Sequence, residues 1–344
     1  MAHFQHSRKQ KYARKKLYPA DCRLYLNSWI RRSSLCSINT SSMLAPTSKK
    51  YFSLLKSSSS FKTYRLLIVG FGDIAHRLAG YLNTSINICA YSRSSPNLSN
   101  VRWKSVNLDH ITKLPKHAFT GMIYLAPPPS TGDKDTRIKR FLAGFHSNRS
   151  VYVSTTGVYG DQAGLWIDET QPIKPQTPRA QRRVDAERIF RKWGKFYGRH
   201  AMILRSPGIY AADRLPIERL KAKTPALNKE EDVYSNHIHA DDLARLCWLT
   251  LFRGRSQRIY NACDHTQMYM GEYFDTVAYA FKLPLPLRVS RQELAAQVSA
   301  MQLSFMQESR RIKNERILNE LGFVFHYPHL ENWLLKTASQ KTIT

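Results

Sequence analysis

A short apolar run, followed at once by a glycine turn and an amphipathic helix, constrains this chain more than any other feature. Residues Arg65 to Val69 have the continuous apolar character of a parallel strand buried on both faces. Gly70, Gly72 and Ala75 follow as G-x-G-x-x-A. Gly70 would permit the tight turn, Gly72 would let a pyrophosphate approach the backbone, and Ala75 would let helix and strand pack closely. An ordinary glycine turn is the alternative, but this context favours a dinucleotide site.

Further strands are predicted along the chain, with helical segments between most of them. They are Ile86 to Tyr91, Val101 to Val106, Met122 to Ala126, Val151 to Thr155, Ala201 to Leu204 and Arg258 to Ala262. Strands that alternate with helices form parallel sheets with helices on both faces. The sequence therefore predicts an α/β fold, a Rossmann-type doubly wound parallel sheet of about seven strands.

The end of the second predicted strand bears on the choice of dinucleotide. An acidic residue there would accept hydrogen bonds from the ribose 2′-hydroxyl, whereas a basic residue would pair with a 2′-phosphate. Residues 91–94 read Tyr-Ser-Arg-Ser, without an acid, and Arg93 follows Gly70 at about the usual separation of 20 residues. The alternative is a solvated surface arginine. We therefore expect NADP as the cofactor, with NAD possible.

The first 63 residues differ in composition from the rest of the 344-residue chain. They hold 13 of the 53 Lys and Arg residues but one acid, Asp21, and they are rich in serine. We interpret residues 1–63 as a disordered basic leader. Three origins stay open: an organellar transit peptide, a basic tail that binds nucleic acid or membrane, or an upstream extension with Met43 as a later start.

Composition limits the class of protein, its cellular setting and its partners. Apolar residues make up 42% of the chain, enough for a buried core, and no run of them is long enough to span a bilayer. The five cysteines are odd in number and widely spaced, which suits a reducing compartment. We expect a cytoplasmic protein, with organellar import as the minor alternative. Its expected partners are a small-molecule substrate and, for assembly, a second copy in a homodimer, but no membrane and no specific nucleic acid.

Three further segments carry a family resemblance. They are residues 151–160 (VYVSTTGVYG), 204–210 (LRSPGIY) and 236–245 (NHIHADDLAR). In order and spacing they resemble the extended short-chain dehydrogenase/reductases, the NAD-dependent epimerase/dehydratase group. The resemblance implies an NAD(P)-binding Rossmann domain over residues 64–335. Within it, a small C-terminal substrate region would come mainly from residues 207–257 and 263–335, and residues 336–344 would form a tail. The resemblance also implies that Ala126 and Pro207 lie at the cofactor.

The resemblance also indicates which residues of this chain occupy the family's catalytic positions. At two of these positions the chain departs from the family. The family's catalytic Ser/Thr falls on Thr155. The tyrosine and lysine of its Tyr-x-x-x-Lys helix fall on Arg179 and Arg183. A guanidinium cannot exchange a proton as that tyrosine does, because its pKa lies above about 12. Arg183 could still bind the nicotinamide ribose, and Arg179 could bind an anionic substrate. Tyr159 is a candidate substitute acid, with packing as its alternative role.

Two charged clusters complete the candidates. His237 and His239, with Asp241 and Asp242, have the residue types of a metal site, but they immediately precede a predicted helix. We interpret the aspartates as a helix cap and expect no metal. Arg214 follows the sixth predicted strand, on the side of the sheet where ligands bind, and is a candidate substrate contact. An ion pair with Asp213 or Glu218 is its alternative.

These features lead to two functional hypotheses. The first is an oxidoreductase or epimerase that uses NAD(P) on a hydroxyl or carbonyl carbon of a small anionic or sugar-like metabolite. The intact hydroxyl of Thr155 favours it. The second is a non-catalytic NADP(H)-binding redox sensor or regulator, which the missing tyrosine and lysine favour.

Overall fold

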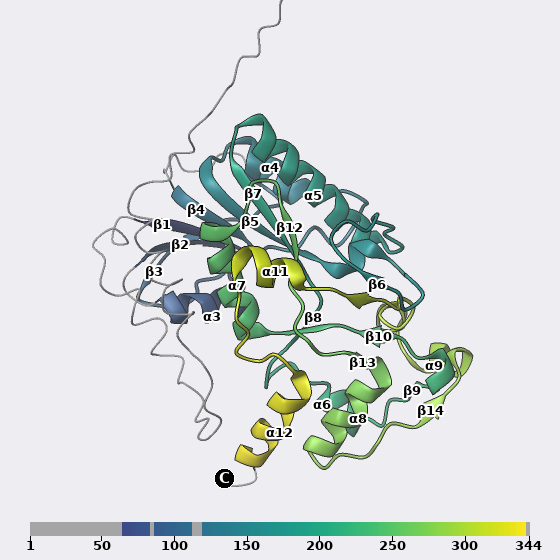
Figure 1. The fold of residues 1–344 in the computed structure, drawn as a ribbon. Helices are drawn as coiled ribbons and strands as arrows, with labels where there is room; N and C mark the ends of the chain where they lie inside the picture. The colour runs from purple at the N-terminus through teal and green to yellow at the C-terminus, as the bar shows by residue number, and fades with distance from the viewer. Residues whose placement is uncertain (1–63, 83–85, 112–118, 342–344) are drawn as a thin grey trace, which may run out of the picture. The chain divides into compact units, whose positions relative to one another are not determined.

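A seven-stranded sheet lies at the centre of the protein (Figure 1), for which a computed structural model describes residues 64–82, 86–111 and 119–341. The strands lie in the order β12-β7-β5-β4-β1-β2-β3, and every neighbouring pair is parallel. This confirms the predicted doubly wound α/β fold. The interpretation of residues 1–63 as a leader concerns residues outside the described ranges.

The central strands match the predicted ones with shifted ends. They are β1 (Arg65–Val69), β2 (Asn87–Ser92), β3 (Val101–Ser105), β4 (Phe119–Tyr124), β5 (Ser147–Thr155), β7 (His200–Ser206) and β12 (Ile259–Asn261). The fourth strand ends at Tyr124, so Ala126 lies in the following loop and not in the strand as predicted. The amides of Leu125 and Ala126 both donate to the Val69 carbonyl, at 2.8 and 3.0 Å, and Pro127 then stops the ladder because it has no N–H.

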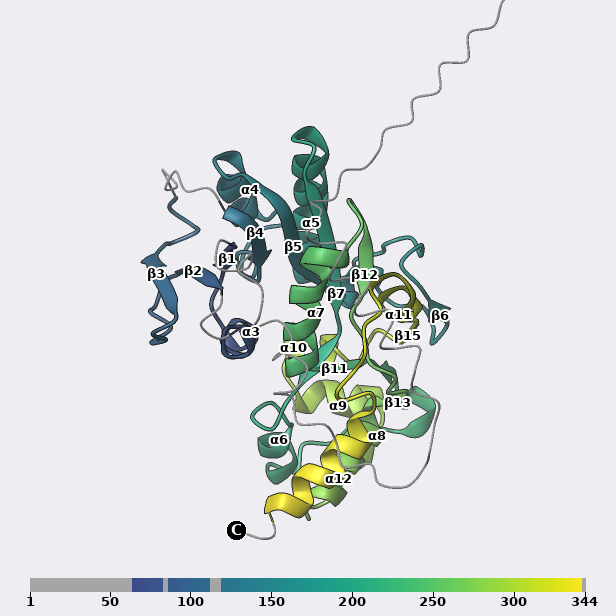
Figure 2. The same ribbon diagram turned by 60° about the vertical axis from the view of Figure 1, so that its left-hand side comes forward.

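Helices cover both faces of the sheet (Figure 2). One side carries α4 (Thr136–Ala143) and α5 (Pro178–Phe196), and the other carries α3 (Asp73–Leu82) and α7 (Ala240–Arg253). Helix α3 buries the apolar positions expected from its period: Ile74, Ala75, Leu78, Ala79 and Leu82. Their burial confirms that the glycine turn opens onto a helix packed against the sheet.

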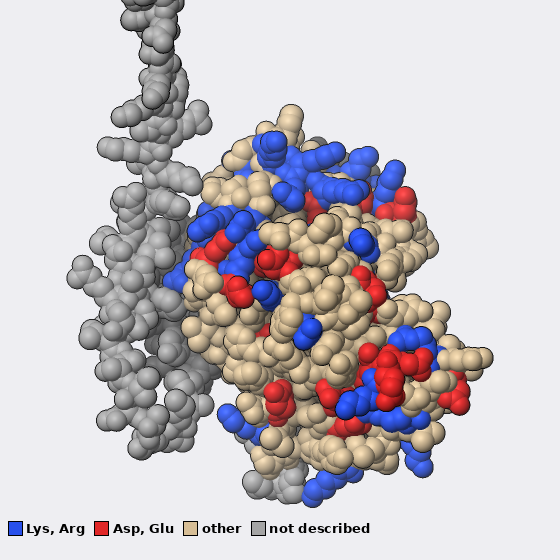
Figure 3. All heavy atoms as spheres, turned by 45° about the vertical axis from the view of Figure 1, so that its right-hand side comes forward, with Lys and Arg blue, Asp and Glu red and all other residues tan. Residues whose placement is uncertain are grey.

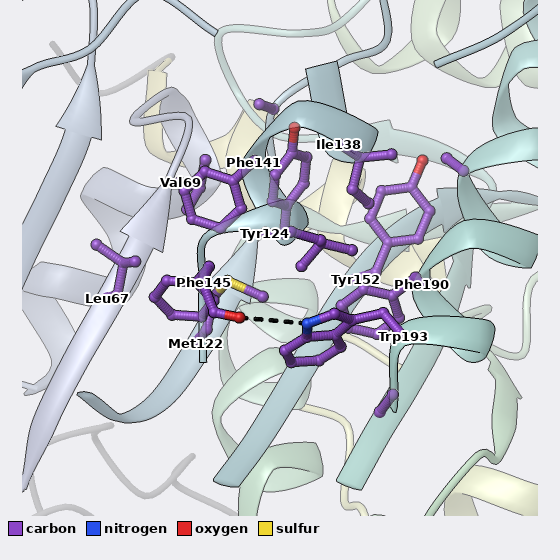
Figure 4. Close-up of a cluster of buried hydrophobic side chains, with 14 of the residues drawn as sticks. Leu67, Val69, Met122, Tyr124, Ile138, Phe141, Phe145, Tyr152, Phe190 and Trp193 are labelled. Carbon is purple, nitrogen blue, oxygen red and sulfur yellow. Dashed lines mark hydrogen bonds between the residues drawn. The ribbon is translucent and has the colours of Figure 1, made fainter. Parts of the chain in front are cut away.

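Large aromatic side chains fill the layer between the sheet and α4 and α5 (Figure 4). Tyr124 packs edge-on against Phe141 of α4, with ring centroids 5.6 Å apart, and Phe190 stacks on Trp193 within α5 at 5.7 Å. The indole N–H of Trp193 donates to the Phe145 carbonyl at 3.2 Å. This packing fixes α5, and therefore the direction of the side chains at its N-terminus.

The C-terminal region is built from short elements around a core of its own, which includes Tyr210, Leu227, Phe274 and Leu334. Outside the central sheet, short strands form two-stranded sheets: β6 (Trp166–Ile167) with β15 (Arg311–Ile312), β8 (Gly208–Tyr210) with β11 (His237–His239), β9 (Ala226–Leu227) with β14 (Arg288–Val289), and β10 (Tyr234–Ser235) with β13 (Met268–Tyr269). The remaining helices are α6 (Ile217–Lys221), α8 (Met270–Ala280), α9 (Arg291–Gln297), α10 (Ala300–Ser304), α11 (Glu315–Leu321) and α12 (Leu330–Lys341), and the 3₁₀ turns are η4 (Thr156–Tyr159) and η5 (Lys229–Glu231). The last helix runs through residues 336–341, which the sequence analysis assigned to a tail.

The predicted helix start at the histidine and aspartate cluster is present, but its cap differs. Helix α7 begins at Ala240, and the capping acceptor is Nδ1 of His239, which receives the Asp241 N–H at 3.1 Å. The carboxylate of Asp242 is fully buried and accepts the N–H groups of His326 and Tyr327 instead. The prediction of a carboxylate cap was therefore wrong, because these aspartates bind partners far away in sequence.

Candidate functional site

The glycine turn has the geometry that the sequence motif requires. Gly70 has a φ of +82°, and a Cβ there would lie 2.6 Å from the Ala126 nitrogen. Only glycine fits such a position without strain. A Cβ at Gly72 would meet no atom within 4 Å among the described residues, so this glycine leaves open space in front of the first turn of α3. Ala75 is fully buried against the sheet.

A crevice of about 490 Å³ runs along the carboxyl ends of the central strands, starting at this turn. Most of the predicted site residues line it: Gly70, Gly72, Ala75, Arg93, Ala126, Thr155, Arg183, Pro207 and Arg214. Two predicted residues, Tyr159 and Arg179, are not among the residues that line it. We call the part formed by residues 70–75 and 92–94 the dinucleotide end, and the part formed by residues 154–155 and 183 the catalytic end.

At the dinucleotide end, Arg93 lies in a loop held by its neighbours. The Ser92 hydroxyl donates to the Ser94 carbonyl at 2.7 Å and accepts the indole N–H of Trp103 at 3.1 Å. Arg93 itself is exposed, and it forms no ion pair with any acidic side chain of the described ranges. The guanidinium is therefore available to an anionic ligand in the crevice.

A network of charges surrounds the first turn of α3. Arg214 pairs with the Asp73 carboxylate, with Nε 3.0 Å from Oδ2, and does not use the predicted alternatives Asp213 and Glu218. Arg77 donates to the other oxygen of Asp73 at 2.8 Å and also to Asp241 at 2.7 Å. Arg214 thus reaches the mouth of the glycine turn, where a pyrophosphate would lie. This position makes it a candidate cofactor contact, whereas the sequence suggested a substrate contact.

Another ion pair, between Arg137 and Asp109, lies in the crevice lining close to Pro127 in the loop after β4. Arg137 of α4 holds Asp109 with two hydrogen bonds of 2.7 Å and donates to the carbonyls of Pro127 and Pro128 at 3.2 and 3.1 Å. Hydrogen bonding to Arg137 lowers the pKa of Asp109. The pair ties the loop after β3 to the loop after β4. Sequence reasoning missed it, because no local pattern relates residues so far apart.

At the catalytic end, two adjacent hydroxyls differ in their surroundings. The Thr155 oxygen accepts the Gly157 N–H at 3.2 Å and caps η4, which leaves its own proton free to be donated. The Ser154 hydroxyl is buried, lines the crevice and has no hydrogen-bond partner in the part of the chain described. Ser154 was not singled out from the sequence, although it directly precedes the matched position.

The candidate substitute acid, Tyr159, is buried behind the crevice. Its hydroxyl donates to Oδ1 of Asn261 at 2.8 Å, and its ring lies 4.6 Å from the guanidinium of Arg205. Burial raises the pKa of Tyr159 to about 12. These contacts match its alternative role in packing.

The two arginines at the start of α5 point to different places. Arg183 reaches the crevice and donates to the Tyr152 hydroxyl and the Val153 carbonyl, both at 3.0 Å. Arg179 stacks over the ring of Phe305 at 4.3 Å, and burial lowers its pKa. The structure therefore brings Arg183 together with Thr155 and leaves Arg179 outside the crevice lining.

The chemistry of the crevice is that of an anion site without a neutral-pH acid or base. Its described lining contains four arginines, two aspartates and no histidine, lysine or cysteine. Burial raises the pKa of Tyr91, the one lining tyrosine among these residues, to about 12. No three metal-ligating side chains gather anywhere in the described ranges. None of the helices described is long and apolar enough to cross a membrane.

Comparison with known sequences gives a family and partial relatives. The model of the NAD dependent epimerase/dehydratase family matches residues 136–263. Protein YeeZ of Escherichia coli is 28% identical over 182 residues, which are 52% of this chain and 59% of YeeZ. Human dTDP-D-glucose 4,6-dehydratase is 27% identical over 127 residues, 34% of this chain and 36% of that enzyme. The matches thus span less than two thirds of the length of these relatives.

Solved structures resemble the chain over more of its length. A functionally unknown conserved protein from Silicibacter pomeroyi superposes with a TM-score of 0.65 at 26% identity, covering 81% of this chain and 99% of that one. The dTDP-glucose 4,6-dehydratase of Bacillus anthracis, in complex with NAD, gives 0.65 at 15% identity, covering 82% and 97%. The UDP-glucose 4-epimerase of Thermotoga maritima, with UDP-glucose, gives 0.63 at 13%, covering 81% and 100%. The last two show a shared fold.

Proposed function

Because residues 136–263 match the model of the NAD dependent epimerase/dehydratase family, we propose that this chain is an NADP(H)-dependent enzyme of that family. Its substrate would be a small anionic or sugar-like metabolite, attacked at a hydroxyl or carbonyl carbon. One observation carries the proposal: the glycine turn, Arg93, Thr155 and Arg183 all line a single crevice at the carboxyl ends of the strands. The dTDP-glucose and UDP-glucose named for the structural relatives support a sugar-like substrate class.

The preference for NADP over NAD rests on charge at the ribose position. Arg93 is exposed and lacks an acidic partner in the described ranges, so it can pair with a 2′-phosphate. The loop contains no acid that would accept hydrogen bonds from a free 2′-hydroxyl. Gly70, Gly72, Ala75, Ala126 and Pro207 would supply backbone and small side chains along the rest of the dinucleotide.

The catalytic end offers donors and positive charge. A bound nicotinamide would supply or accept the hydride. Thr155 keeps a proton to donate, Ser154 has an unused hydroxyl, and Arg183 brings a guanidinium to the crevice. Preorganised donors of this kind polarise a carbonyl oxygen, to whose carbon a bound nicotinamide would deliver the hydride. The resulting alkoxide would take its proton from water, and the reverse reaction would return that proton to water. We therefore propose hydride transfer at a carbonyl or hydroxyl carbon, in either direction.

The affinity of the two cofactors tests the proposal. We expect the parent protein to bind NADP more tightly than NAD. The Arg93→Ala variant should reduce the difference in binding free energy between the two dinucleotides by about 1.5 to 3 kcal/mol, because it loses a charge-assisted contact. Arg102→Ala is the matched control, because Arg102 is an exposed cation on the neighbouring strand outside the crevice lining. Isothermal titration of the three proteins with both dinucleotides gives the six affinities. Equal affinities in the parent protein would refute the NADP assignment.

A second function, an NADP(H)-binding sensor without turnover, is favoured by two observations. Tyr159 is buried and bonded to Asn261, and arginines occupy the positions of the family's tyrosine and lysine. Screening oxidation of bound NADPH against a panel of carbonyl metabolites and a cell extract separates the two. Tight binding of NADPH without turnover on the panel or the extract would exclude the enzyme hypothesis and favour the sensor hypothesis.

Setting and assembly form the last part of the proposal. The three cysteines in the described ranges, Cys89, Cys247 and Cys263, are free thiols, which supports a reducing, cytoplasmic setting. We propose the arrangement of a Rossmann domain over residues 64–335 with a substrate region from residues 207–257 and 263–335, and a homodimer as the assembly. Sedimentation equilibrium measures the assembly directly.

A further inference from the structure

The outer face of α5 carries four cations in one stripe. Arg188, Arg191, Lys192 and Lys195 are all exposed, and their spacing places them on one side of the helix. Figure 3 shows Lys and Arg side chains gathered at the top of the view, where this helix lies. None of the four forms an ion pair with an acidic residue of the described ranges. We call these four residues the basic face.

The acidic residues of α5 do not neutralise this face. Glu187 is buried and pairs with Arg205 in the core at 2.7 Å, and Asp185 accepts the backbone N–H of Asp135 at 2.9 Å. The neighbouring helix α4 adds Lys139 and Arg140, both exposed. Arg140 donates to the Asp109 carbonyl at 2.8 Å, and the Asp109 carboxylate nearby is already paired with Arg137. Positive charge therefore extends over both helices.

Two exposed aromatic rings lie at the end of the same helix. Phe196 is 82% exposed and Tyr197 is 41% exposed, so much of the Phe196 ring meets solvent. Tyr197 packs edge-on against Phe196 at 4.8 Å and against His146 at 4.9 Å, which holds the pair in place. An exposed ring beside a row of cations offers stacking and charge together.

We propose that the basic face, with Phe196, binds the backbone of single-stranded nucleic acid without reading its sequence. Phosphates need only cations and hydrogen-bond donors, and the bases can stack on an exposed ring. A stable protein interface would require an apolar centre, and membrane insertion an apolar helix face. Apart from Phe196 and Tyr197, the exposed side of α5 has neither. None of these residues lines the crevice, so the proposal is independent of cofactor binding.

Fluorescence anisotropy of a labelled oligouridylate of about 12 nucleotides tests this with the full chain. In the test variant, the four residues of the basic face become glutamine. In the control, four exposed lysines elsewhere become glutamine: Lys223, Lys229, Lys282 and Lys336. Both variants lose the same charge and keep residues 1–63. We expect the test variant to bind about tenfold more weakly or worse, with a log–log salt slope shallower by about 2 to 3, and the control to stay within about twofold of the parent.

Phe196→Ala probes stacking separately, with Tyr279→Ala as the control because Tyr279 is 70% exposed away from this face. We expect a loss of about fivefold or more for Phe196→Ala alone. Thermal unfolding and NADP titration verify that each variant is folded. An equal loss in the two quadruple variants would overturn the proposal, since binding would then follow net charge. If the variant with the four substitutions in the basic face lost its binding to phosphatidylserine vesicles but bound oligouridylate as the parent does, the basic face would bind membranes. That result would also overturn the proposal.

Discussion

The two ends of the crevice use their residues differently. At the dinucleotide end, Gly72 faces open space and Arg93 is exposed without an acidic partner among the described residues. At the catalytic end, Arg183 is bonded to Tyr152 and Val153, and the Thr155 oxygen already accepts an N–H. The first end is open to a ligand, whereas at the second only the Ser154 hydroxyl and the proton of Thr155 are not used in contacts with described residues.

This difference shows that dinucleotide binding and catalysis place separate requirements on the residues of the crevice. Binding a dinucleotide depends on backbone shape and a few donors, which glycine and arginine provide. Catalysis by the family's usual route depends on a titratable side chain that points at the substrate, and Tyr159 points at Asn261 instead. A chain can therefore keep the first property and change the second.

Gly72→Val should produce the largest effect at the dinucleotide end. The new side chain would occupy the approach of the pyrophosphate, and we expect affinity for NADP and NAD to fall by about 100-fold or more. No described atom lies within 4 Å of a Cβ at this position, so the fold should tolerate it. Gly80→Val is the matched control, because Gly80 lies in α3 with equally open space around it. Calorimetry gives the affinities, and thermal melting gives the stability. Weak binding together with a large drop in melting temperature would attribute the effect to unfolding.

Arg214→Ala should have a smaller effect that does not discriminate between the cofactors. If Arg214 meets the pyrophosphate, both NADP and NAD should bind about tenfold more weakly, whereas Arg93→Ala affects NADP alone. Part of the loss arises because Asp73 would be left beside the phosphates without this partner.

The double variant Asp73→Asn/Arg214→Ala isolates that part, since removing the carboxylate should restore some affinity for both cofactors. Comparison of the four proteins in a double-mutant cycle gives the coupling between the two side chains. An unchanged affinity for both cofactors in Arg214→Ala, with a change in substrate KM, would return Arg214 to the substrate role that its sequence position suggested.

Sequence predicted the parts of this site that depend on neighbouring residues. The glycine turn and the buried face of α3 follow from patterns within a few residues, and the family resemblance of residues 151–160 implied the position of Thr155. The ion-pair partner of Arg214 could not be predicted, because Asp73 lies more than a hundred residues earlier. The direction of the Arg179 side chain likewise depends on its contact with Phe305, which only the tertiary structure brings close. Local patterns establish which residues approach the crevice, and long-range packing decides where their side chains point.

The two hydroxyls of the catalytic end give a prediction about stability. Thr155→Val removes the acceptor that caps η4, so the free energy of unfolding should fall by about 1 kcal/mol. Ser154→Ala removes a buried hydroxyl that has no partner in the described ranges, so stability should stay unchanged or rise slightly. Urea denaturation measures both. A larger loss for Ser154→Ala than for Thr155→Val would mean that Ser154 has a structural partner and is not free for a ligand.

Removing residues 1–60 should have the smallest effect at either end of the crevice. All strands of the central sheet and all residues lining the crevice come from residue 65 onward. A chain that begins at Phe61 should therefore bind NADP within about twofold of the parent and melt at nearly the same temperature. The deletion also removes 12 Lys and Arg residues, so oligonucleotide binding should weaken and lose part of its salt dependence. Binding that survives in the shortened chain should still depend on the basic face. Loss of NADP affinity on truncation would show instead that the first 60 residues support the dinucleotide end.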